Sequence, residues 1–188
     1  MPTFYEGGPV QTVEQMIGPE DYAAAYAAAQ SAISPIHKKW VKAGICASAA
    51  IVIASFIPFY RARFSSCWAP SCGIVLALAL GFLFLFVQPN DIRRWAVELY
   101  RSNALLALPH KIQLFRDSAV IESSCEKILE YWTDFTKCIE TPAAFVLTGG
   151  RERELLIIKK QGLTNEQKEK ISAHLAGAFA SRYVKSGR

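Results

Sequence analysis

The chain contains 188 residues, of which 52% are hydrophobic, and it carries a formal net charge of +5. This length allows one small globular domain with additional segments, rather than several domains. The apolar residues are concentrated between Val41 and Val87, whereas the segment from His110 onward mixes basic and acidic residues. The positive balance therefore does not indicate a nucleic-acid partner, because the basic residues lie beside apolar runs or among acidic ones.

Residues 1–39 are expected to form a short cytoplasmic segment with one strand and one helix. Val10 to Ile17 partly alternates apolar and polar residues and predicts a weak strand that ends at Gly18-Pro19. The alanine-rich stretch from Glu20 to Ser34 predicts a helix. No Lys or Arg precedes Lys38, so a cleavable signal peptide is not expected, and the first apolar run is expected to remain as an anchor.

Residues 40–88 predict a transmembrane helical hairpin with helices at about 41–60 and 68–87. Twenty helical residues extend about 30 Å, the thickness of a hydrocarbon core. The first run has one charge, Lys42, at an edge from which its side chain can reach the headgroups, and residues 64–88 have none. Both runs lack the polar face of a soluble helix, and so small a chain could not cover them. The lipid bilayer is therefore the first expected partner.

The basic residues that flank the hairpin predict its orientation. Short cytoplasmic segments are richer in Lys and Arg than segments on the other side of a membrane. Both termini are therefore expected in the cytoplasm, and the chain is expected to be a multi-pass protein of the inner cell membrane. The terminal side carries Lys38, Lys39, Lys42, Arg93, Arg94 and Arg101, and the turn carries Arg61 and Arg63.

Small residues recur at helical spacing on both predicted membrane helices. They allow close backbone approach, either between the two helices, which the short connection favours, or between copies of the chain in a homo-oligomer. Cys67 and Cys72 lie near the turn and could form a disulfide on an oxidising side, or could be small residues at a helix end. The small residues are Gly73, Ala77 and Gly81 on the second helix and Ala43, Ala47, Ala50 and Ala54 on the first.

Residues 89–108 predict an amphipathic juxtamembrane helix that begins at Asn90, a capping residue after Pro89, and ends near Leu106. Ile92, Trp95 and Leu99 fall on one stripe of this helix. The stripe fits two places equally well, the membrane surface or the domain that follows.

Residues 109–188 predict a small antiparallel β-sheet capped by a C-terminal helix, which makes the whole chain an α+β membrane protein. Arg116-Asp117 and Gly149-Gly150 are expected turns. Thr164 and Gln167 predict a capping box at the start of the last helix. Because the 79 residues from His110 onward are few for such a domain, Val10 to Ile17 is expected to return and pair with the sheet. The expected strands are 110–115, 118–124, 126–132, 135–140, 143–147 and 154–160.

A membrane hairpin followed by this module resembles the YcxB-like family of bacterial membrane proteins. The resemblance rests on Trp132, Phe135, Ile139 and Glu140 in the segment YWTDFTKCIE, on the strand AAFVL and on LLIIKKQGL. It implies a pleckstrin-homology-like (PH-like) domain over residues 109–188. It implies no activity that could be assigned to particular residues.

Catalytic and metal-binding patterns are not found in the sequence. The only histidines are His37, His110 and His174, and no motif pairs one of them with a nucleophile or gives metal-ligand spacing. His174 is expected to be packed or exposed rather than catalytic, and Trp132 is expected in the core. The chain is therefore expected not to be an enzyme and to use no cofactor or metal.

Six basic residues of the C-terminal domain are candidate contacts for a ligand. If they gather on one side, they could bind anionic lipid headgroups; otherwise they belong to a solvated face mixed with Glu140, Glu152 and Glu154. The six are Lys127, Lys137, Arg151, Arg153, Lys159 and Lys160.

Two functions remain open. The first is a membrane-anchored, non-enzymatic binding module whose cytoplasmic domain holds a lipid or a protein segment, the latter by adding a strand to a sheet edge. The alternative is an accessory subunit of a membrane complex that docks through the small residues of the hairpin.

Overall fold

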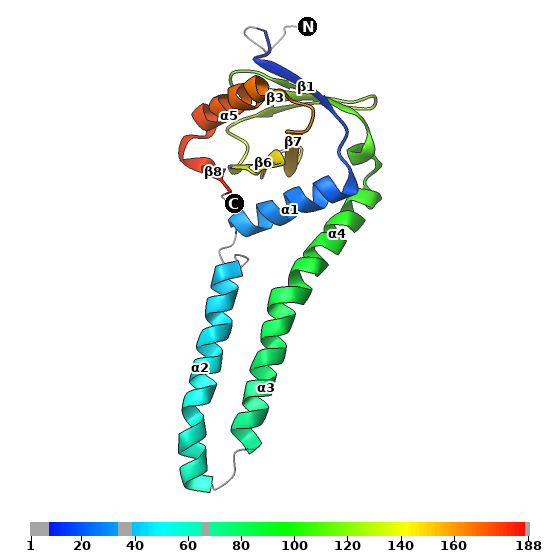
Figure 1. Cartoon of the computed structure of the whole chain (residues 1–188). Coiled ribbons are helices and arrows are strands. Elements are labelled where there is room, and N and C mark those ends of the chain that lie inside the picture. The colour runs from blue at the N-terminus through cyan, green and yellow to red at the C-terminus, as the bar shows by residue number, and fades with distance from the viewer. Residues whose placement is uncertain (1–7, 34–38, 65–67, 187–188) are drawn as a thin grey trace. The chain divides into compact units, whose positions relative to one another are not determined.

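The computed structural model describes residues 8–33, 39–64 and 68–186. The chain divides into two compact units (Figure 1). Residues 30–94 form a helical unit, and residues 1–29 together with 95–188 form an α+β unit. Each unit is described by itself.

The helical unit contains two long apolar helices that lie side by side (Figure 1). The first is α2, Lys39–Phe64, and the second is α3, Trp68–Phe82, which continues through the π-helical turn η2, Leu83–Val87, into α4, Gln88–Ser102. In the described residues, one helix is by itself long and apolar enough to cross a membrane, the segment Trp40–Arg63 of α2, with a mean hydropathy of 1.9. The apolar stretch Ser71–Phe82 is shorter. A second crossing is therefore not established by the helix lengths.

The expected helix start at Asn90 is wrong, because the helix runs through this point without a break. The amide of Gln88 donates to the Leu83 carbonyl, five residues back, which is the π-helical spacing. Pro89 has no amide hydrogen, and a π turn next to it is one way for a helix to pass a proline. The expected end near Leu106 is also wrong, because α4 ends at Ser102. Asn103 then caps the short 3-10 helix η3, Ala104–Ala107, by accepting a hydrogen bond from Leu105.

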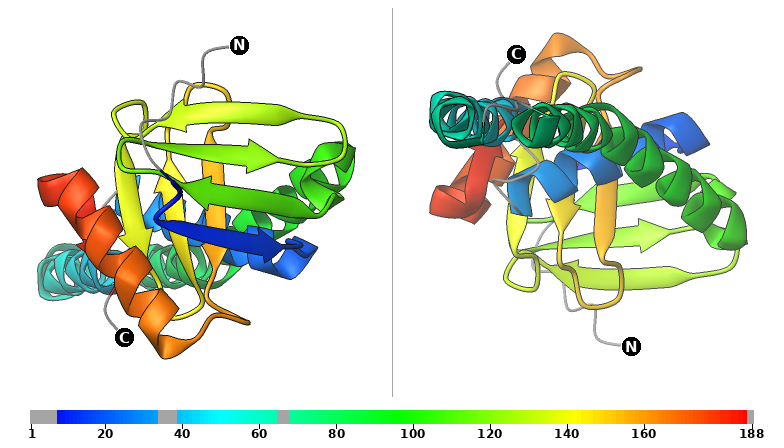
Figure 2. Two further views of the ribbon diagram at one scale, coloured as in Figure 1. Left: turned by 90° about the horizontal axis from the view of Figure 1, so that it is seen from above. Right: turned by 90° about the horizontal axis from the view of Figure 1, so that it is seen from below.

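The α+β unit begins with an antiparallel sheet of order β1-β2-β3-β4 (Figure 2). The N-terminal strand pairs with β2, with Gln11 opposite Leu114 and Gln15 opposite His110, so the expected return of this segment to the sheet is confirmed. The four strands are β1, Gln11–Gln15; β2, His110–Leu114; β3, Ser118–Glu122; and β4, Lys127–Tyr131.

A second sheet has the order β7-β6-β5-β8, so the expectation of a single antiparallel sheet is incomplete. Its last strand, β8, runs parallel to β5 and was not expected, because three residues are too few to show an alternating pattern. The four strands are β5, Lys137–Glu140; β6, Ala144–Thr148; β7, Leu155–Lys159; and β8, Tyr183–Lys185.

The C-terminal helix α5, Asn165–Phe179, packs onto the core of the sheets. Its expected capping box is present, with Thr164 accepting from the Gln167 amide and Gln167 accepting from the Thr164 amide. The core includes Phe179 and, as expected, Trp132, which is 3% exposed. The indole N–H of Trp132 donates to the carbonyls of Phe115 and Arg116, so burial leaves no unpaired donor on this ring.

Helix α1, Pro19–Ile33, packs through aromatic rings onto the last part of α4. Tyr22 lies 5.8 Å from Tyr100 and Tyr26 lies 5.2 Å from Trp95, measured between ring centroids. The hydroxyl of Tyr100 donates to the Ile17 carbonyl at 2.6 Å. The part of the amphipathic helix from Trp95 onward therefore packs against the rest of the α+β unit. This is one of the two locations expected from the sequence, the other being the membrane surface.

The turn between β6 and β7 requires two glycines. Gly149 has a φ of +79°, which L-residues rarely adopt. A Cβ atom on Gly150 would lie 2.3 Å from the Arg153 carbonyl oxygen and 2.7 Å from the Phe135 ring. Neither the backbone atom nor the buried ring has room to move away.

The substitution Gly150→Ala is expected to lower the free energy of unfolding by about 2 to 3 kcal/mol, the cost typical of overpacking. The matched control is Gly177→Ala on α5, where a Cβ would meet nothing within 4 Å. This control should raise stability by about 0.5 to 1 kcal/mol, because alanine favours a helix. Denaturant unfolding of the full chain in detergent measures both. Unfolding is monitored by thiol labelling of the fully buried Cys138, in a background with Cys46→Ser, Cys67→Ser, Cys72→Ser and Cys125→Ser. Equal stability of the two variants would contradict the role given to Gly150.

Candidate functional site

The apolar side chains of α2 and α3 form an extensive uncovered surface in the helical unit. None of the apolar window of α2 is buried within the structure. Soluble monomers rarely expose contiguous apolar patches of more than a few hundred Å². Large exposed side chains on the two helices include Ile51, Val52, Phe56, Phe59, Val75, Leu76, Leu78, Leu80 and Phe82.

Glycines of α3 allow the two helices to approach closely. A Cβ on Gly81 would lie 3.3 Å from the Cys46 sulfur, and one on Gly73 would lie 3.4 Å from the Ile53 side chain. Both glycines are therefore at the contact, as the sequence predicted. On α2 the contact runs through Cys46 and Ile53, one residue away from the expected alanines. Of these, Ala43, Ala47 and Ala54 are exposed.

A groove of about 250 Å³ remains beside this helix contact. The predicted residues Ala77 and Ala50 line it, together with Cys46 and Gly81. Its walls are almost entirely apolar. The groove is open because small side chains leave space that no larger side chain fills.

Lys42 is buried inside the hairpin instead of extending toward the headgroups. It is 3% exposed, and its ammonium donates to the Phe84 carbonyl at 3.2 Å and to Gln88 Oε1 at 2.6 Å. The ammonium also lies 4.8 Å from the centre of the Phe84 ring. Because Phe84 belongs to the π turn, Lys42 supplies a donor where the helix changes its hydrogen-bond spacing.

The structure does not bring the six candidate basic residues to one place. Lys159 and Lys160 lie at the end of β7, which pairs with the start of β6. Lys137 lies opposite Thr148 at the other end of β6, where Arg151 and Arg153 follow in the loop. Lys127 is on the other sheet, at the start of β4.

Three of the six basic side chains form enclosed ion pairs, and Lys127 forms a fourth, exposed pair with Glu122 at 4.0 Å. Lys159 donates to Asp21 at 2.7 Å, and this contact holds the pKa of Asp21 below its usual value. Lys160 donates to Glu140 at 2.8 Å. Arg153 pairs with Glu126 and contacts His110 Nε2 at 3.1 Å. These three cations are therefore neutralised within the fold.

Arg153 links the start of β2 to the start of β4, because its guanidinium contacts both His110 and Glu126. Burial, followed by the nearby guanidinium of Arg153, lowers the pKa of His110, so its ring is neutral at pH 7. A neutral ring can accept the hydrogen bond from Arg153 at Nε2.

The buried carboxylate of Glu130 holds the loop that carries Arg151 and Arg153. It is 0% exposed and accepts hydrogen bonds from three successive amides, those of Arg151, Glu152 and Arg153, at 2.7 to 3.1 Å. Successive amides that point to one place form an anion-binding concavity. In this fold an internal carboxylate already fills it, so it is not open to a ligand.

A surface cavity of about 290 Å³ lies beside this loop, within the α+β unit. The apolar residues of the lining are Tyr22, Leu99, Leu105, Leu106, Ile128 and Leu155. The polar groups of the lining are Asn103, Glu126, Glu152, Arg153 and Glu154. From the sequence, Glu152 and Glu154 were expected only as neighbours of the basic residues, because nothing in their spacing indicated that they share a cavity with Tyr22.

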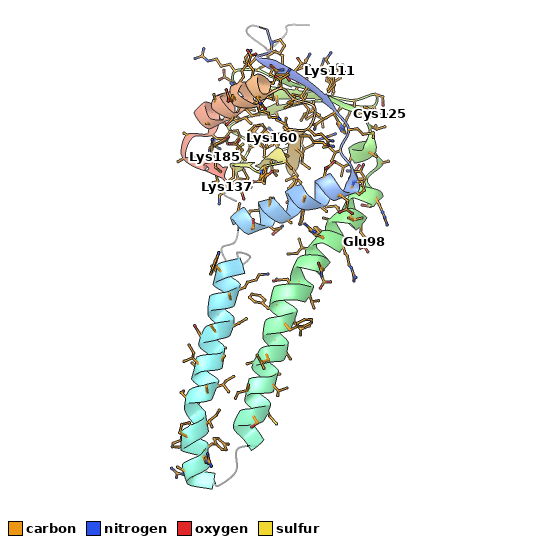
Figure 3. All side chains as sticks on the ribbon, viewed as in Figure 1. Glu98, Lys111, Cys125, Lys137, Lys160 and Lys185 are labelled. Carbon is orange, nitrogen blue, oxygen red and sulfur yellow. The ribbon has the colours of Figure 1, made fainter. Side chains whose placement is uncertain are left out.

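Glu140 anchors the C-terminal strand through a network of polar side chains. Its carboxylate accepts hydrogen bonds from Lys160 at 2.8 Å and Tyr183 at 2.6 Å, and Ser172 donates at 3.3 Å. Lys185 adds an ion pair at 3.4 Å. Figure 3 shows Lys160 and Lys185 on the side of the unit that carries α5 and β8, away from Cys125.

The remaining candidates of the sequence have structural environments. His174 Nε2 lies 2.9 Å from the Phe115 carbonyl, and the ring packs against Trp132. Cys72 is exposed, and Cys67 lies outside the described residues. Among the described residues, no three His, Cys, Asp or Glu side chains come together as a metal site.

Comparisons of the chain with models of known protein families, with curated proteins and with solved structures gave no match.

The Glu140 network predicts a dependence of stability on pH. Burial alone would raise the pKa of Glu140, but the hydrogen bonds from Lys160 and Tyr183 and the charge of Lys160 outweigh it and lower the pKa to about 2. A carboxyl whose pKa is lower in the folded state stabilises the fold above its unfolded pKa. This contribution is lost as pH falls from about 5 to about 2.

Glu140→Gln is accordingly expected to lower the free energy of unfolding at pH 7 by about 2 kcal/mol and to flatten the loss of stability below pH 5. Glu166→Gln, an exposed position on α5, is the matched control and should change stability by less than about 0.5 kcal/mol. The measurement is unfolding of the full chain at several pH values, followed at Cys138. A Glu140→Gln variant with the pH profile of the unmodified protein would contradict the network.

Proposed function

We propose that the chain is a membrane-anchored, non-enzymatic binding module. Its hairpin lies in the inner membrane of a bacterial cell, and its α+β unit presents a binding surface to the cytoplasm. The observation that carries this proposal is the uncovered apolar surface of α2, whose segment Trp40–Arg63 contains an apolar 18-residue window with no buried part in the structure. A bilayer would cover this surface, which water would not tolerate.

Two crossings by the hairpin fit the helix lengths when the π turn is included. Trp68 to Val87 is one continuous apolar helical path, from the start of α3 to the end of η2. Its twenty residues extend about 30 Å, as a crossing requires. The larger number of basic residues on the terminal side favours a cytoplasmic location for both termini.

The proposal includes the assignment of the α+β unit as a PH-like, YcxB-type domain. Two four-stranded sheets enclose one core, and α5 packs on that core through Ile171, Leu175 and Phe179. In such a module a ligand is bound by surface and edge groups, so no catalytic group is required.

A protein segment is a better ligand for this module than an anionic headgroup. Lys159, Lys160, Arg153 and Lys127 form ion pairs within the unit, and the six basic residues do not gather at one place. Anionic headgroups attract clusters of several cations near one surface.

The alternative, an accessory subunit that docks through the hairpin, is favoured by the groove beside Cys46 and Gly81. A helix of another membrane protein could pack against such small residues. This alternative predicts that replacement of the hairpin by an unrelated anchor abolishes function, whereas the binding module predicts that function survives.

Membrane anchorage is tested by two acidic substitutions on α2. Val52→Asp with Phe56→Asp places two charges in the apolar core, at a cost of about 2.5 to 3.5 kcal/mol each. The unmodified chain should stay with membranes during alkaline carbonate extraction, and this variant should be released. The control, Ala173→Asp with Gly177→Asp on the exposed side of α5, adds the same charge and should stay. Release of the unmodified chain would contradict the anchor.

The number of crossings is tested by thiol labelling in sealed vesicles. In a background without other cysteines, Cys125 reports on the α+β unit and Arg63→Cys reports on the hairpin turn. With two crossings, an impermeant maleimide added outside inverted vesicles should label Cys125 and not position 63, and right-side-out vesicles should give the opposite result. Labelling of both positions from one side would show that α3 does not cross.

A further inference from the structure

The outer edge of β4 has backbone groups that no strand pairs with in the described part of the chain. Figure 2 shows β4 as the outermost strand of its sheet. The Trp132 amide donates to the Asp117 carbonyl and the Ser123 amide donates to the Glu126 carbonyl, which fixes the phase of the ladder. Even-numbered residues of β4 therefore bond to β3, and the N–H and C=O groups of Lys127, Leu129 and Tyr131 point outward.

The open part of this edge is short. Tyr131 is engaged in a turn, because its carbonyl accepts from the Asp134 amide at 3.0 Å and its amide donates to the Asp134 carboxylate at 3.4 Å. The free groups are thus those of Lys127 and Leu129. The edge of β7 differs, because the Gln15 side chain donates to the Ile157 carbonyl and accepts from the Lys159 amide.

The surface cavity of about 290 Å³ that contains Glu152 and Glu154 lies next to the start of this open edge. Glu126 and Ile128 of the β4 segment line the cavity, so an extended chain paired with Lys127 and Leu129 would pass its mouth. Successive side chains of such a chain alternate in direction, and one of them would enter the cavity.

The charge of the cavity selects a cation. Glu126 is neutralised by Arg153, but Glu152 and Glu154 are exposed and have no ion-pair partner among the described residues. The apolar part of the lining, which includes Tyr22 and Leu106, suits the aliphatic stem of a long basic side chain. Arg and Lys combine such a stem with a positive head, and Tyr22 adds an aromatic ring.

We propose that the β4 edge and this cavity bind an extended, basic segment of a partner protein. The segment adds a short strand to β4, and one of its Arg or Lys side chains occupies the cavity against Glu152 and Glu154. This inference rests on the proposed binding function and gives it a location and a ligand chemistry. A second copy of the same edge is disfavoured, because the exposed Lys127 of each copy would lie on the shared edge.

The test uses the full-length protein in nanodiscs and fluorescent nine-residue peptides of alternating Thr and Val with Arg, Gln or Glu at the centre. Fluorescence anisotropy gives the affinity of each. The Arg peptide should bind about tenfold more tightly than the Gln peptide and weaken as salt rises, and the Glu peptide should bind least. Equal affinities, or no binding of any peptide up to about 1 mM, would overturn the proposal.

Two sets of variants separate the cavity from the edge. Glu152→Gln with Glu154→Gln should remove the preference for Arg over Gln, whereas Glu166→Gln with Glu169→Gln on α5 makes the same charge change and should keep it. Leu129→Pro removes an outward amide without breaking a bond to β3, and it should weaken all three peptides at least tenfold. Labelling of Cys138 verifies that each variant is folded.

A small amine is the competing ligand. N-acetyl-arginine amide should bind at least tenfold more weakly than the Arg peptide, because it cannot pair with β4. Equal affinity, or no effect of Leu129→Pro, would reduce the site to a small-cation pocket and overturn the strand-addition proposal.

Failure of this site and failure of the proposed function give different results. In the first case, the hairpin is replaced by an unrelated anchor and the cavity and edge variants are added. If this protein still binds a partner, the binding function is retained and the proposed site is wrong. Loss of the partner upon hairpin replacement alone rejects the binding module itself.

Discussion

The apolar side chains that α2 and α3 direct outward constrain everything else about this protein. Contact with water costs about 25 cal/mol per Å² of apolar surface, and the described residues of the helical unit leave these side chains uncovered. A bilayer covers them at no such cost, but it also requires every backbone polar group in the apolar region to be paired. The π turn and Lys42 fit that requirement, since the ammonium donates to the Phe84 carbonyl where the hydrogen-bond spacing changes.

The α+β unit uses most of its buried charges to hold itself together. Glu130 fixes the β6–β7 loop, Arg153 ties that loop to Glu126, and Glu140 secures β8 through Tyr183 and Lys160. Breaking a buried pair from one side is costly, so these groups are not available to a ligand. The exposed carboxylates of Glu152 and Glu154 remain in the cavity beside β4, although the chain as a whole is positive. The protein's net charge is therefore a poor guide to the ligand of this unit.

Periodic features were predictable from the sequence, and side-chain partnerships were not. The strand at residues 11–15 and the capping box at Thr164 follow from short-range patterns, and the pairing of this strand with the sheet was expected from the small size of the C-terminal domain; all three are present. The strand β8 is too short for a pattern, and the helix contact on α2 runs one residue away from the alanine stripe because Cys46 and Ile53, rather than alanines, meet the glycines of α3. Which basic residues are neutralised depends on contacts such as Lys159 with Asp21, 138 residues apart, which no local pattern encodes.

The depth of α2 and α3 in a bilayer is measured most directly by spin labelling of the full chain in lipid vesicles. Nitroxides at Val52→Cys and Leu78→Cys, with the natural cysteines replaced by serine, report accessibility to oxygen, which partitions into lipid, and to a water-soluble nickel complex. A hairpin that crosses twice predicts high oxygen and low nickel accessibility at both positions. Higher accessibility to nickel than to oxygen at either position would contradict a hairpin anchored across the membrane.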